Sequence, residues 1–370
     1  MKVLIIANYA KEHINKFHLE TIRRFKELGW QVDVACRADA EIPGADRVFD
    51  LPMERNPFRL RSLSAIRQLK EILRQGDYQA IHCHTMAGKV IGILAARHFR
   101  RSGLRILYTS HGFQYYSGAP LRNWLALPLD KWLMRYVDVL ITINREDDRN
   151  ARRFRFKAKH LFQCHGAGVP LERFRQEGTP RQAVRESLGI PADAKVLNYV
   201  AELNRNKNQE YLLRMFAQLK TEIPDLYMLL VGPDHYDGRI QREIQSAGDA
   251  GRILCLGWRS DVGDLIRASD VAVASSIREG FGINIVEYMA CGVPVVATDN
   301  RGHRETIEDG VTGYLTPLRD PSMMADRVRL LLTDADRRSA VTSAASERLP
   351  QYDEQTIVQQ IVDIYRNYVE

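Results

Sequence analysis

Two glutamates flank a glycine loop in the stretch SIREGFGINIVEYMACGVPVVATD, residues 276–299. Glu279 precedes Gly280 and Gly282, and Glu287 follows about one turn inside a helix that we expect to begin directly after the loop. The free N–H groups and the dipole of such a helix start favour a phosphate. An ionised carboxylate only accepts hydrogen bonds, so its natural partners beside a phosphate are hydroxyls. The pattern therefore predicts a diphosphate between a ribose and a sugar, with an ordinary helix start and two solvated glutamates as the alternative.

Short apolar runs alternate with helical segments along the chain, which is typical of parallel sheets with helices on both faces. The expected strands of the first half are Lys2–Ala7, Gln31–Ala35, Ala80–His82, Arg105–Thr109, Val137–Ile143 and His160–Cys164. The cycle restarts with Lys195–Ala201, Leu226–Val231, Arg252–Leu256, Asp270–Ala274 and Val293–Thr298. The expected helices are Ile14–Leu28, Ser64–Arg74, Ala87–Arg101, Leu121–Tyr136, Lys207–Thr221, Val262–Ala268, Ile283–Cys291 and Ser322–Leu332. The sequence thus predicts an α/β protein of two doubly wound Rossmann-like domains facing a central cleft, with ligands at the carboxyl ends of the strands.

The length of 370 residues also favours two domains. The polar stretch 173–182, which contains Gly178 and Pro180, is the expected linker. We therefore expect one domain at 1–175 and a second at 180–350. A final helix, Glu354–Tyr368, has its own apolar spacing, and the sequence leaves open whether residues 352–370 return to the first domain.

The glycine loop also carries a resemblance to a known family. E-G-F-G-x-x-x-x-E followed by M-A-C-G-V-P-V-V-A-T resembles the signature of glycosyltransferase family 4, a family of retaining enzymes with the two-domain GT-B fold. The segments HCHT (82–85), TSHGF (109–113) and LITIN (140–144) resemble the members that build bacterial capsule, exopolysaccharide or O-antigen units. The resemblance implies a retaining hexosyltransferase that uses a nucleotide diphosphate sugar, with a UDP-sugar favoured. No DxD-like metal site appears at a strand end, so we expect activity without a metal, and we expect no other cofactor. The first domain would bind the acceptor and the second the donor.

The resemblance implies roles at matching positions of the second domain. Glu279 would hold hydroxyls of the donor sugar, and Glu287 those of the nucleotide ribose. Lys207 falls where the family has a phosphate-binding lysine, and a cation there would stabilise the charge that develops on the leaving diphosphate. The other expected donor contacts are Gly280, Phe281, Gly282, Ile283, Asn284 and Gly257.

One departure from the family pattern affects the phosphate site. Where the family has Gly-Arg-Leu before the lysine, this chain reads Ala201-Glu202-Leu203, so Glu202 replaces a phosphate-binding arginine. Arg205 could reach the phosphate instead. Glu202 could orient Lys207 or Arg205, or meet a hydroxyl, and the sequence leaves these alternatives open.

In the first domain, His111 follows an expected strand and so lies at a carboxyl end. The resemblance places it near the reacting sugar, where a hydrogen bond would orient the reactants. The loop after the first strand supplies four candidate acceptor contacts: His13, Asn15, Lys16 and His18. We interpret Asp130 as a surface charge and Asp138 as a strand-start residue, and we assign no general base. The family's usual mechanism is same-face attack, in which the leaving diphosphate takes the acceptor proton.

Charge is unevenly distributed along the chain. Residues 1–175 contain 31 Lys+Arg and 17 Asp+Glu, a balance of +14, whereas the other 195 residues contain 22 and 29, a balance of −7. Basic segments at Arg59–Arg67 and Arg149–Lys159, with aromatic residues such as Tyr115 and Trp124, predict a surface for anionic lipid headgroups. A polyprenyl-diphosphate-linked glycan is the matching acceptor. Solvated faces with core aromatic residues, and a soluble acceptor, are the alternatives.

The expected location is the cytoplasm, either free or attached to the inner face of the cell membrane. The longest N-terminal apolar run, Val3–Ala7, is too short for a signal peptide, and five scattered cysteines suit buried thiols in a reducing compartment. Strand alternation sends Cys83 away from His82 and His84, so we expect no metal at that segment. Alternative functions are a nucleotide-sugar epimerase of the same fold and a basic nucleic-acid-binding protein. The chain has no recognisable nucleic-acid module, so we expect no nucleic-acid partner.

Overall fold

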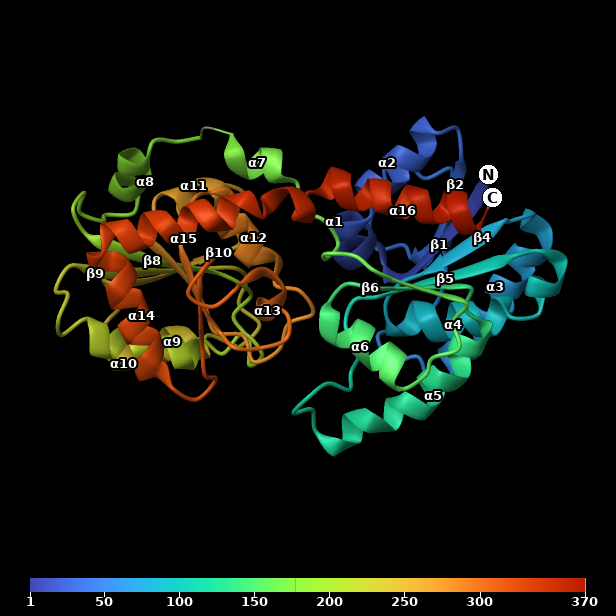
Figure 1. The fold of residues 1–370 in the computed structure, drawn as a ribbon, viewed down its shortest axis with the longest axis horizontal. Coiled ribbons are helices and arrows are strands. Elements are labelled where there is room, and N and C mark those ends of the chain that lie inside the picture. The colour runs from blue at the N-terminus through green and yellow to red at the C-terminus, as the bar shows by residue number, and fades with distance from the viewer. Residues whose placement is uncertain (177, 370) are drawn as a thin grey trace. The chain divides into compact units, whose positions relative to one another are not determined.

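The computed structural model describes residues 1–176 and 178–369, which form two compact units (Figure 1). Unit 1 contains Met1–Gly168 and the C-terminal segment from Glu354, and unit 2 contains Val169–Asp353. The stretch proposed as the linker, 173–182, lies in unit 2. Its residue 177 lies outside the described residues, as does Glu370 at the end of the segment 352–370.

Unit 1 is built on a parallel sheet of seven strands in the order β3-β2-β1-β4-β5-β6-β7. Its strands are β1 (Lys2–Tyr9), β2 (Gln31–Arg37), β3 (Arg47–Asp50), β4 (Ala80–Cys83), β5 (Arg105–Ser110), β6 (Val139–Thr142) and β7 (His160–Gln163). Most central strands are apolar and buried along their length, as expected for a sheet covered on both faces. The chain order reverses between β1 and β4, and such a switch point is where ligands bind in sheets of this kind.

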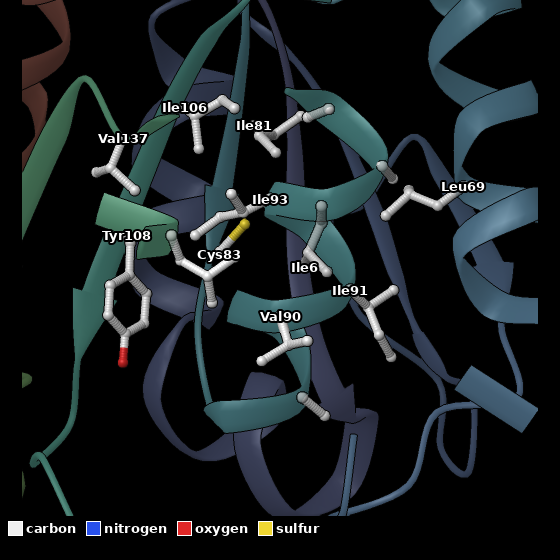
Figure 2. Packing of buried hydrophobic residues seen from close by; sticks show 14 of the residues in the cluster. Ile6, Leu69, Ile81, Cys83, Val90, Ile91, Ile93, Ile106, Tyr108 and Val137 are labelled. Carbon is white, nitrogen blue, oxygen red and sulfur yellow. The ribbon is translucent and has the colours of Figure 1, made fainter. Parts of the chain in front are cut away.

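Helices cover both faces of this sheet. They are η1 (Ala10–Ile14), α1 (Asn15–Phe17), α2 (Leu19–Glu27), α3 (Arg61–Gly76), α4 (Met86–Ala96), η2 (Phe99–Ser102), η3 (Leu121–Leu125), α5 (Ala126–Leu133), η4 (Met134–Tyr136), α6 (Arg145–Arg153) and α16 (Glu354–Tyr368). On one face, Cys83 points into a cluster with Ile6, Ile93 and Ile106 (Figure 2). On the other face, α16 packs beside α2, and Tyr365 contacts the rings of Phe25 and Trp30. The first and last parts of the chain therefore share one core.

Unit 2 contains a second parallel sheet of six strands in the order β10-β9-β8-β11-β12-β13. The strands are β8 (Lys195–Val200), β9 (Leu226–Val231), β10 (Ile253–Gly257), β11 (Val271–Ala274), β12 (Val295–Thr298) and β13 (Tyr314–Thr316). The helices are α7 (Leu171–Arg175), α8 (Arg181–Ser187), α9 (Gln209–Leu219), α10 (Arg239–Ser246), α11 (Val262–Arg267), α12 (Ile283–Ala290), α13 (His303–Thr306), α14 (Pro321–Thr333), α15 (Ala335–Glu347) and η5 (Leu349–Tyr352). The two Rossmann-like sheets confirm the α/β fold class expected from the sequence.

Several elements were not predicted from the sequence, for identifiable reasons. The edge strand β3 is largely exposed, and β13 has three residues, so neither forms a clear apolar run. Helix α6 reads REDDRNARR and has almost no apolar spacing, but the Asn144 side chain caps its start. The helix expected over Leu121–Tyr136 is split into η3, α5 and η4. Pro128 has no N–H for a bond to the carbonyl of Trp124, which accounts for the change from 3-10 to α geometry near that point.

Asp130 is not the surface charge that was expected from the sequence. Its side chain is buried and accepts hydrogen bonds from Lys89 Nζ at 2.5 Å and from the Tyr115 hydroxyl at 3.0 Å. A buried lysine and a buried carboxylate pair in this way because either charge alone would be costly in the core. Tyr115 is therefore a core residue rather than an aromatic residue at a lipid surface.

No helix among residues 1–176 and 178–369 is both long enough and apolar enough to cross a membrane.

Candidate functional site

Lys207 and Glu279 form an ion pair in unit 2, although 72 residues separate them in the chain. Lys207 Nζ donates to Glu279 Oε1 at 2.5 Å, and both side chains are about one-fifth exposed or less. Burial alone would raise the pKa of Glu279, but Lys207 and His303 more than offset this effect and lower the pKa. Burial alone would lower the pKa of Lys207, but Glu279 and Tyr199 raise it above its ordinary value. Both groups are therefore charged at neutral pH.

Hydrogen bonds fix the loop that carries Lys207. Its carbonyl accepts from the hydroxyls of Tyr199 at 3.1 Å and Ser275 at 2.7 Å. Asn206 accepts from the backbone N–H of Ile277 and donates from Nδ2 to the carbonyl of Arg278. The loop after β8 is thus joined to the loop after β11, which is why Lys207 and Glu279 meet.

The N-terminus of α12 lies directly after Glu279 in the chain. Gly282 caps the helix with a φ of +82°, a left-handed conformation that favours glycine, and a Cβ there would lie 3.1 Å from His303 Cδ2. The first N–H groups of the helix, from Ile283 and Asn284, have no intrahelical acceptor, so they are available to an anion. The ring of Phe281 is buried against Tyr352, and Asn284 Nδ2 donates to the carbonyl of Val200. Only the backbone of Phe281 is therefore offered to a ligand.

Glu287 lies one turn into α12 and is half-buried. Burial raises the pKa of its carboxyl to about 7, and Arg173 offsets only part of this effect. Among the described residues, none donates a hydrogen bond to this carboxylate. A half-buried acceptor near a helix start is suited to ligand hydroxyls.

His303, which was not predicted from the sequence, completes this side of unit 2. Its Nδ1 donates to the carbonyl of Thr298 at 2.6 Å, so the proton is on Nδ1 and Nε2 is an acceptor. Nε2 is buried without a partner among the described residues. Gly302 lets this loop approach the site, since a Cβ on it would lie 2.5 Å from Glu279 Cβ. The sequence did contain a signal that could have predicted His303. Like Lys207 and Glu279, it follows an apolar strand within a few residues.

The other predicted donor contacts, Glu202, Arg205 and Gly257, make no hydrogen bond or ion pair with the Lys207–Glu279 pair in the part of the chain that the structure describes. Glu202 is exposed, and its carboxylate accepts from Asn204 Nδ2 at 3.2 Å. Arg205 is also exposed and lines a cavity of about 930 Å³ with Asn208, Tyr236 and Arg239 among others. No contact among the described residues brings Arg205 to the Lys207–Glu279 pair. Gly257 ends β10 with a φ of +64°, and its carbonyl accepts from the N–H of Gly232.

Unit 1 gathers histidines at the carboxyl ends of β1, β4 and β5. His13, His18, His84 and His111 each offer one ring nitrogen, and these four atoms lie within 4.8 Å of one another. This group, called the four-histidine cluster below, contains three predicted residues and His84, which was not predicted to be a site residue. Asn15 instead donates from Nδ2 to the carbonyl of Glu41, and Lys16 is exposed. Cys83 faces the opposite core, as strand alternation predicts.

Burial keeps these imidazoles neutral at physiological pH. It lowers the pKa of His111 to about 4, and that of the neighbouring His82, also with a contribution from His111, to about 3. Burial and neighbouring histidines hold the pKa values of His13, His18 and His84 well below the ordinary value. A neutral imidazole can accept a proton, donate a hydrogen bond or bind a metal ion.

Comparison with known proteins gives the family. A family described as Glycosyltransferase Family 4 matches residues 14–167, and one described as Glycosyl transferases group 1 matches residues 180–348. The candidate glycosyltransferase EpsD of Bacillus subtilis (strain 168) is 39% identical over 371 residues, which cover 100% of this chain and 97% of EpsD. The chain belongs to glycosyltransferase family 4.

Solved structures support the same family fold. HepE of Anabaena, crystallised with UDP and glucose, has a TM-score of 0.83 at 21% identity and covers 99% of this chain and 100% of its own. Sucrose-phosphate synthase from Thermosynechococcus elongatus has a TM-score of 0.80 at 22% identity, over 99% of this chain and 98% of its own. The family 4 chain therefore has the GT-B fold, and both the family and the fold expected from the sequence are confirmed.

Proposed function

We propose that this family 4 glycosyltransferase is a retaining hexosyltransferase that takes a hexose from a UDP-sugar. Its acceptor is a lipid-linked glycan in the synthesis of a bacterial surface polysaccharide. The observation that carries the proposal is the Lys207–Glu279 ion pair beside the N-terminus of α12. A cation and free N–H groups suit a diphosphate, and carboxylates suit the hydroxyls on either side of it.

The donor would be held by groups of unit 2. The N-terminus of α12 and Lys207 take the diphosphate, while Glu287 accepts hydrogen bonds from the ribose. Glu279 and the free Nε2 of His303 accept from hydroxyls of the hexose. The presence of UDP and glucose in the crystal structure of HepE agrees with this class of donor.

The reaction breaks the bond between the anomeric carbon and the diphosphate oxygen, and the electron pair stays on the diphosphate. The acceptor hydroxyl oxygen forms the new bond on the same face, and its proton moves to the departing diphosphate. Lys207 and the helix N-terminus stabilise the charge that grows on the leaving group. The His111 imidazole, which is neutral, orients the reacting hydroxyls by hydrogen bonding.

Unit 1 would meet the lipid of the acceptor. Leu60, Leu121 and Leu125 are 86%, 87% and 80% exposed, and Leu60 and Leu121 each stand beside an arginine in the chain. Apolar side chains next to cations suit an anionic membrane surface. The enzyme would then work at the inner face of the cell membrane, where a cytoplasmic donor is available.

We propose that the transfer needs no metal, because the groups beside Glu279 are a cation and a helix N-terminus rather than paired carboxylates. Purified protein should transfer hexose in excess EDTA. Loss of transfer in EDTA, with restoration by magnesium or manganese, would overturn this part.

The function is tested by incubating the protein with a set of UDP-sugars, with and without a polyprenyl-diphosphate-linked glycan. We expect a product only when the acceptor is present, apart from slow hydrolysis, with the anomeric configuration of the donor kept in the new linkage. A changed sugar nucleotide formed without acceptor would indicate an epimerase instead. An inverted linkage would overturn the retaining assignment alone.

A further inference from the structure

The four-histidine cluster brings together residues from three adjacent strand ends. His13 lies in η1 directly after β1, His84 follows β4, and His111 follows β5. His18 comes between α1 and α2. Strands β1, β4 and β5 are neighbours in the sheet, so the topology itself places these imidazoles together at the switch point.

The distances between ring nitrogens match those of a metal site. His13 Nε2 and His18 Nε2 are 3.1 Å apart, and His84 Nδ1 and His111 Nε2 are 3.2 Å apart. Four nitrogens at a tetrahedral zinc ion lie about 3.3 to 3.4 Å from one another, because each zinc–nitrogen bond is about 2.0 to 2.1 Å. Two nitrogen pairs already have nearly this spacing. One ring nitrogen from each of the four histidines lies within 4.8 Å of the others, so the rings must move closer together for all four to bind one ion.

The surroundings of the cluster are suited to one small cation. A cavity of about 30 Å³ is lined by three of the four histidines, His18, His84 and His111. The rest of its lining combines polar residues, His82, Thr21 and Thr109, with apolar residues such as Ile141 and Ile357. This volume exceeds the roughly 10 to 15 Å³ that one water molecule requires.

The ligand set selects the class of ion. The cluster offers four imidazole nitrogens and no carboxylate, and magnesium and calcium prefer oxygen ligands. Imidazole suits zinc, cobalt, nickel and copper. We propose that His13, His18, His84 and His111 form a binding site for one divalent transition-metal ion of the zinc type. Pairwise hydrogen bonds between neutral imidazoles, without a metal, are the competing explanation for the short distances.

Cobalt binding to the full, untagged chain tests the site. The protein is freed of metal with a chelator, the chelator is removed, and Co²⁺ is added stepwise. We expect one equivalent per chain to give the strong visible absorption of four-coordinate cobalt, and zinc to abolish the absorption. His13→Ala and His18→Ala should lose the absorption, whereas His98→Ala, at an exposed position outside the cluster, should keep it.

Thermal unfolding gives a second test of the metal site, which applies even if one of the variants folds poorly. One equivalent of zinc should raise the unfolding midpoint of the wild-type protein, because an ion that binds only the folded chain stabilises it. His13 is only partly buried, so His13→Ala is the variant best able to fold, and zinc should leave its midpoint unchanged. The proposal is overturned if the wild-type chain gives no stoichiometric cobalt spectrum. It is equally overturned if a folded His13→Ala variant binds cobalt as the wild type does.

Discussion

Glu279 and Lys207 depend on each other for their charges, because each is desolvated and each is the main opposite charge acting on the other. In the proposed donor complex, Lys207 gains a phosphate and Glu279 gains hydroxyls. Glu279→Gln keeps the size of the side chain but replaces a carboxylate, which only accepts hydrogen bonds, with an uncharged amide that also donates them. We expect kcat to fall about 10- to 100-fold, since a hydrogen bond to a charged group contributes roughly 1.5 to 3 kcal/mol. Steady-state kinetics with saturating donor measure the effect.

Glu222→Gln is the matched control for this change. Glu222 is an exposed carboxylate of unit 2 that pairs with Arg329. A surface ion pair of this kind contributes little, so the kcat of this variant should equal that of the wild type. Equal rates for Glu279→Gln and the wild type would remove Glu279 from the donor site.

If Glu287 binds the donor ribose as proposed, donor binding should depend on pH. Its pKa is raised to about 7, so the carboxyl loses its proton between about pH 6 and pH 8. Only the ionised form accepts two ribose hydrogen bonds, so the affinity for UDP-glucose should rise over this range. UDP-glucose is chosen because its diphosphate has no ionisation near pH 7. Calorimetric titrations at several pH values should show the rise in the wild type and a flat profile for Glu287→Gln.

The same raised pKa predicts the direction of a stability effect. The folded chain binds the Glu287 proton more tightly than the unfolded chain, whose carboxyl has the ordinary value of 4.5. This contribution is fully present below about pH 4.5 and is lost as the pH rises through about 7. Glu287→Gln should therefore gain stability relative to the wild type as the pH rises from about 4.5 to about 8. Urea unfolding measures the difference, and a constant difference would contradict the shift.

Zinc should inhibit transfer if both the proposed function and the metal site hold. A nitrogen of His111 that coordinates zinc is not available to a hydroxyl. Transfer by the metal-free enzyme should fall as one equivalent of zinc is added, and EDTA should restore it. Zinc should leave the residual rate of His13→Ala unchanged. If that variant is inhibited to the same degree, zinc acts elsewhere. If cobalt binds but transfer is unaffected, the role of His111 is wrong and the site stands.

The start of helix α12 depends on the conformation of its N-cap residue, Gly282. Its φ of +82° is costly for other residues, and an added Cβ would press on the His303 ring. Gly282→Ala should destabilise unit 2 by about 1 to 2 kcal/mol, the cost of a left-handed conformation. It should also weaken donor affinity. Gly251→Ala is the control, since a Cβ there would meet open space. Equal unfolding curves for the two variants would contradict this account.

The glycine loop and the helix start after it could be predicted from the sequence because their signals are local. Two glycines, a helix start and two carboxylates lie within nine consecutive residues, 279–287, and a helix of 3.6 residues per turn fixes their arrangement. Lys207 required the family resemblance, because nothing local joins it to Glu279. His84 and His303 were missed for a different reason. Each lies at a strand end, and only the order of strands in the sheet shows which strand ends are neighbours.

The whole chain divides its charge between the two units, which predicts different surroundings for them. Residues 1–175 carry a balance of +14 and the remainder −7. Two basic residues of unit 1, Arg100 and Lys159, are already paired within that unit, because both form ion pairs with the buried Asp138. Arg59, Arg61 and Arg122 are exposed and lie next to exposed leucines in the chain. Arg59 and Arg61 also form ion pairs with Glu54, at 3.1 and 3.6 Å. The candidate membrane surface is therefore narrower than the sequence suggested.

Flotation with lipid vesicles tests this surface. The wild-type chain should float with vesicles that contain anionic lipid, and salt should reduce the floating fraction because it screens the arginines. Leu121→Asp combined with Leu125→Asp should lower the partition coefficient at least about tenfold, since burying each leucine contributes roughly 1.5 to 3 kcal/mol. Val311→Asp, at an exposed apolar position of unit 2, is the control and should float like the wild type. Flotation that is insensitive to both salt and the leucine substitutions would show that the arginines and leucines of this surface do not hold the chain on the vesicles. A wild-type chain that does not float at all would favour a soluble acceptor.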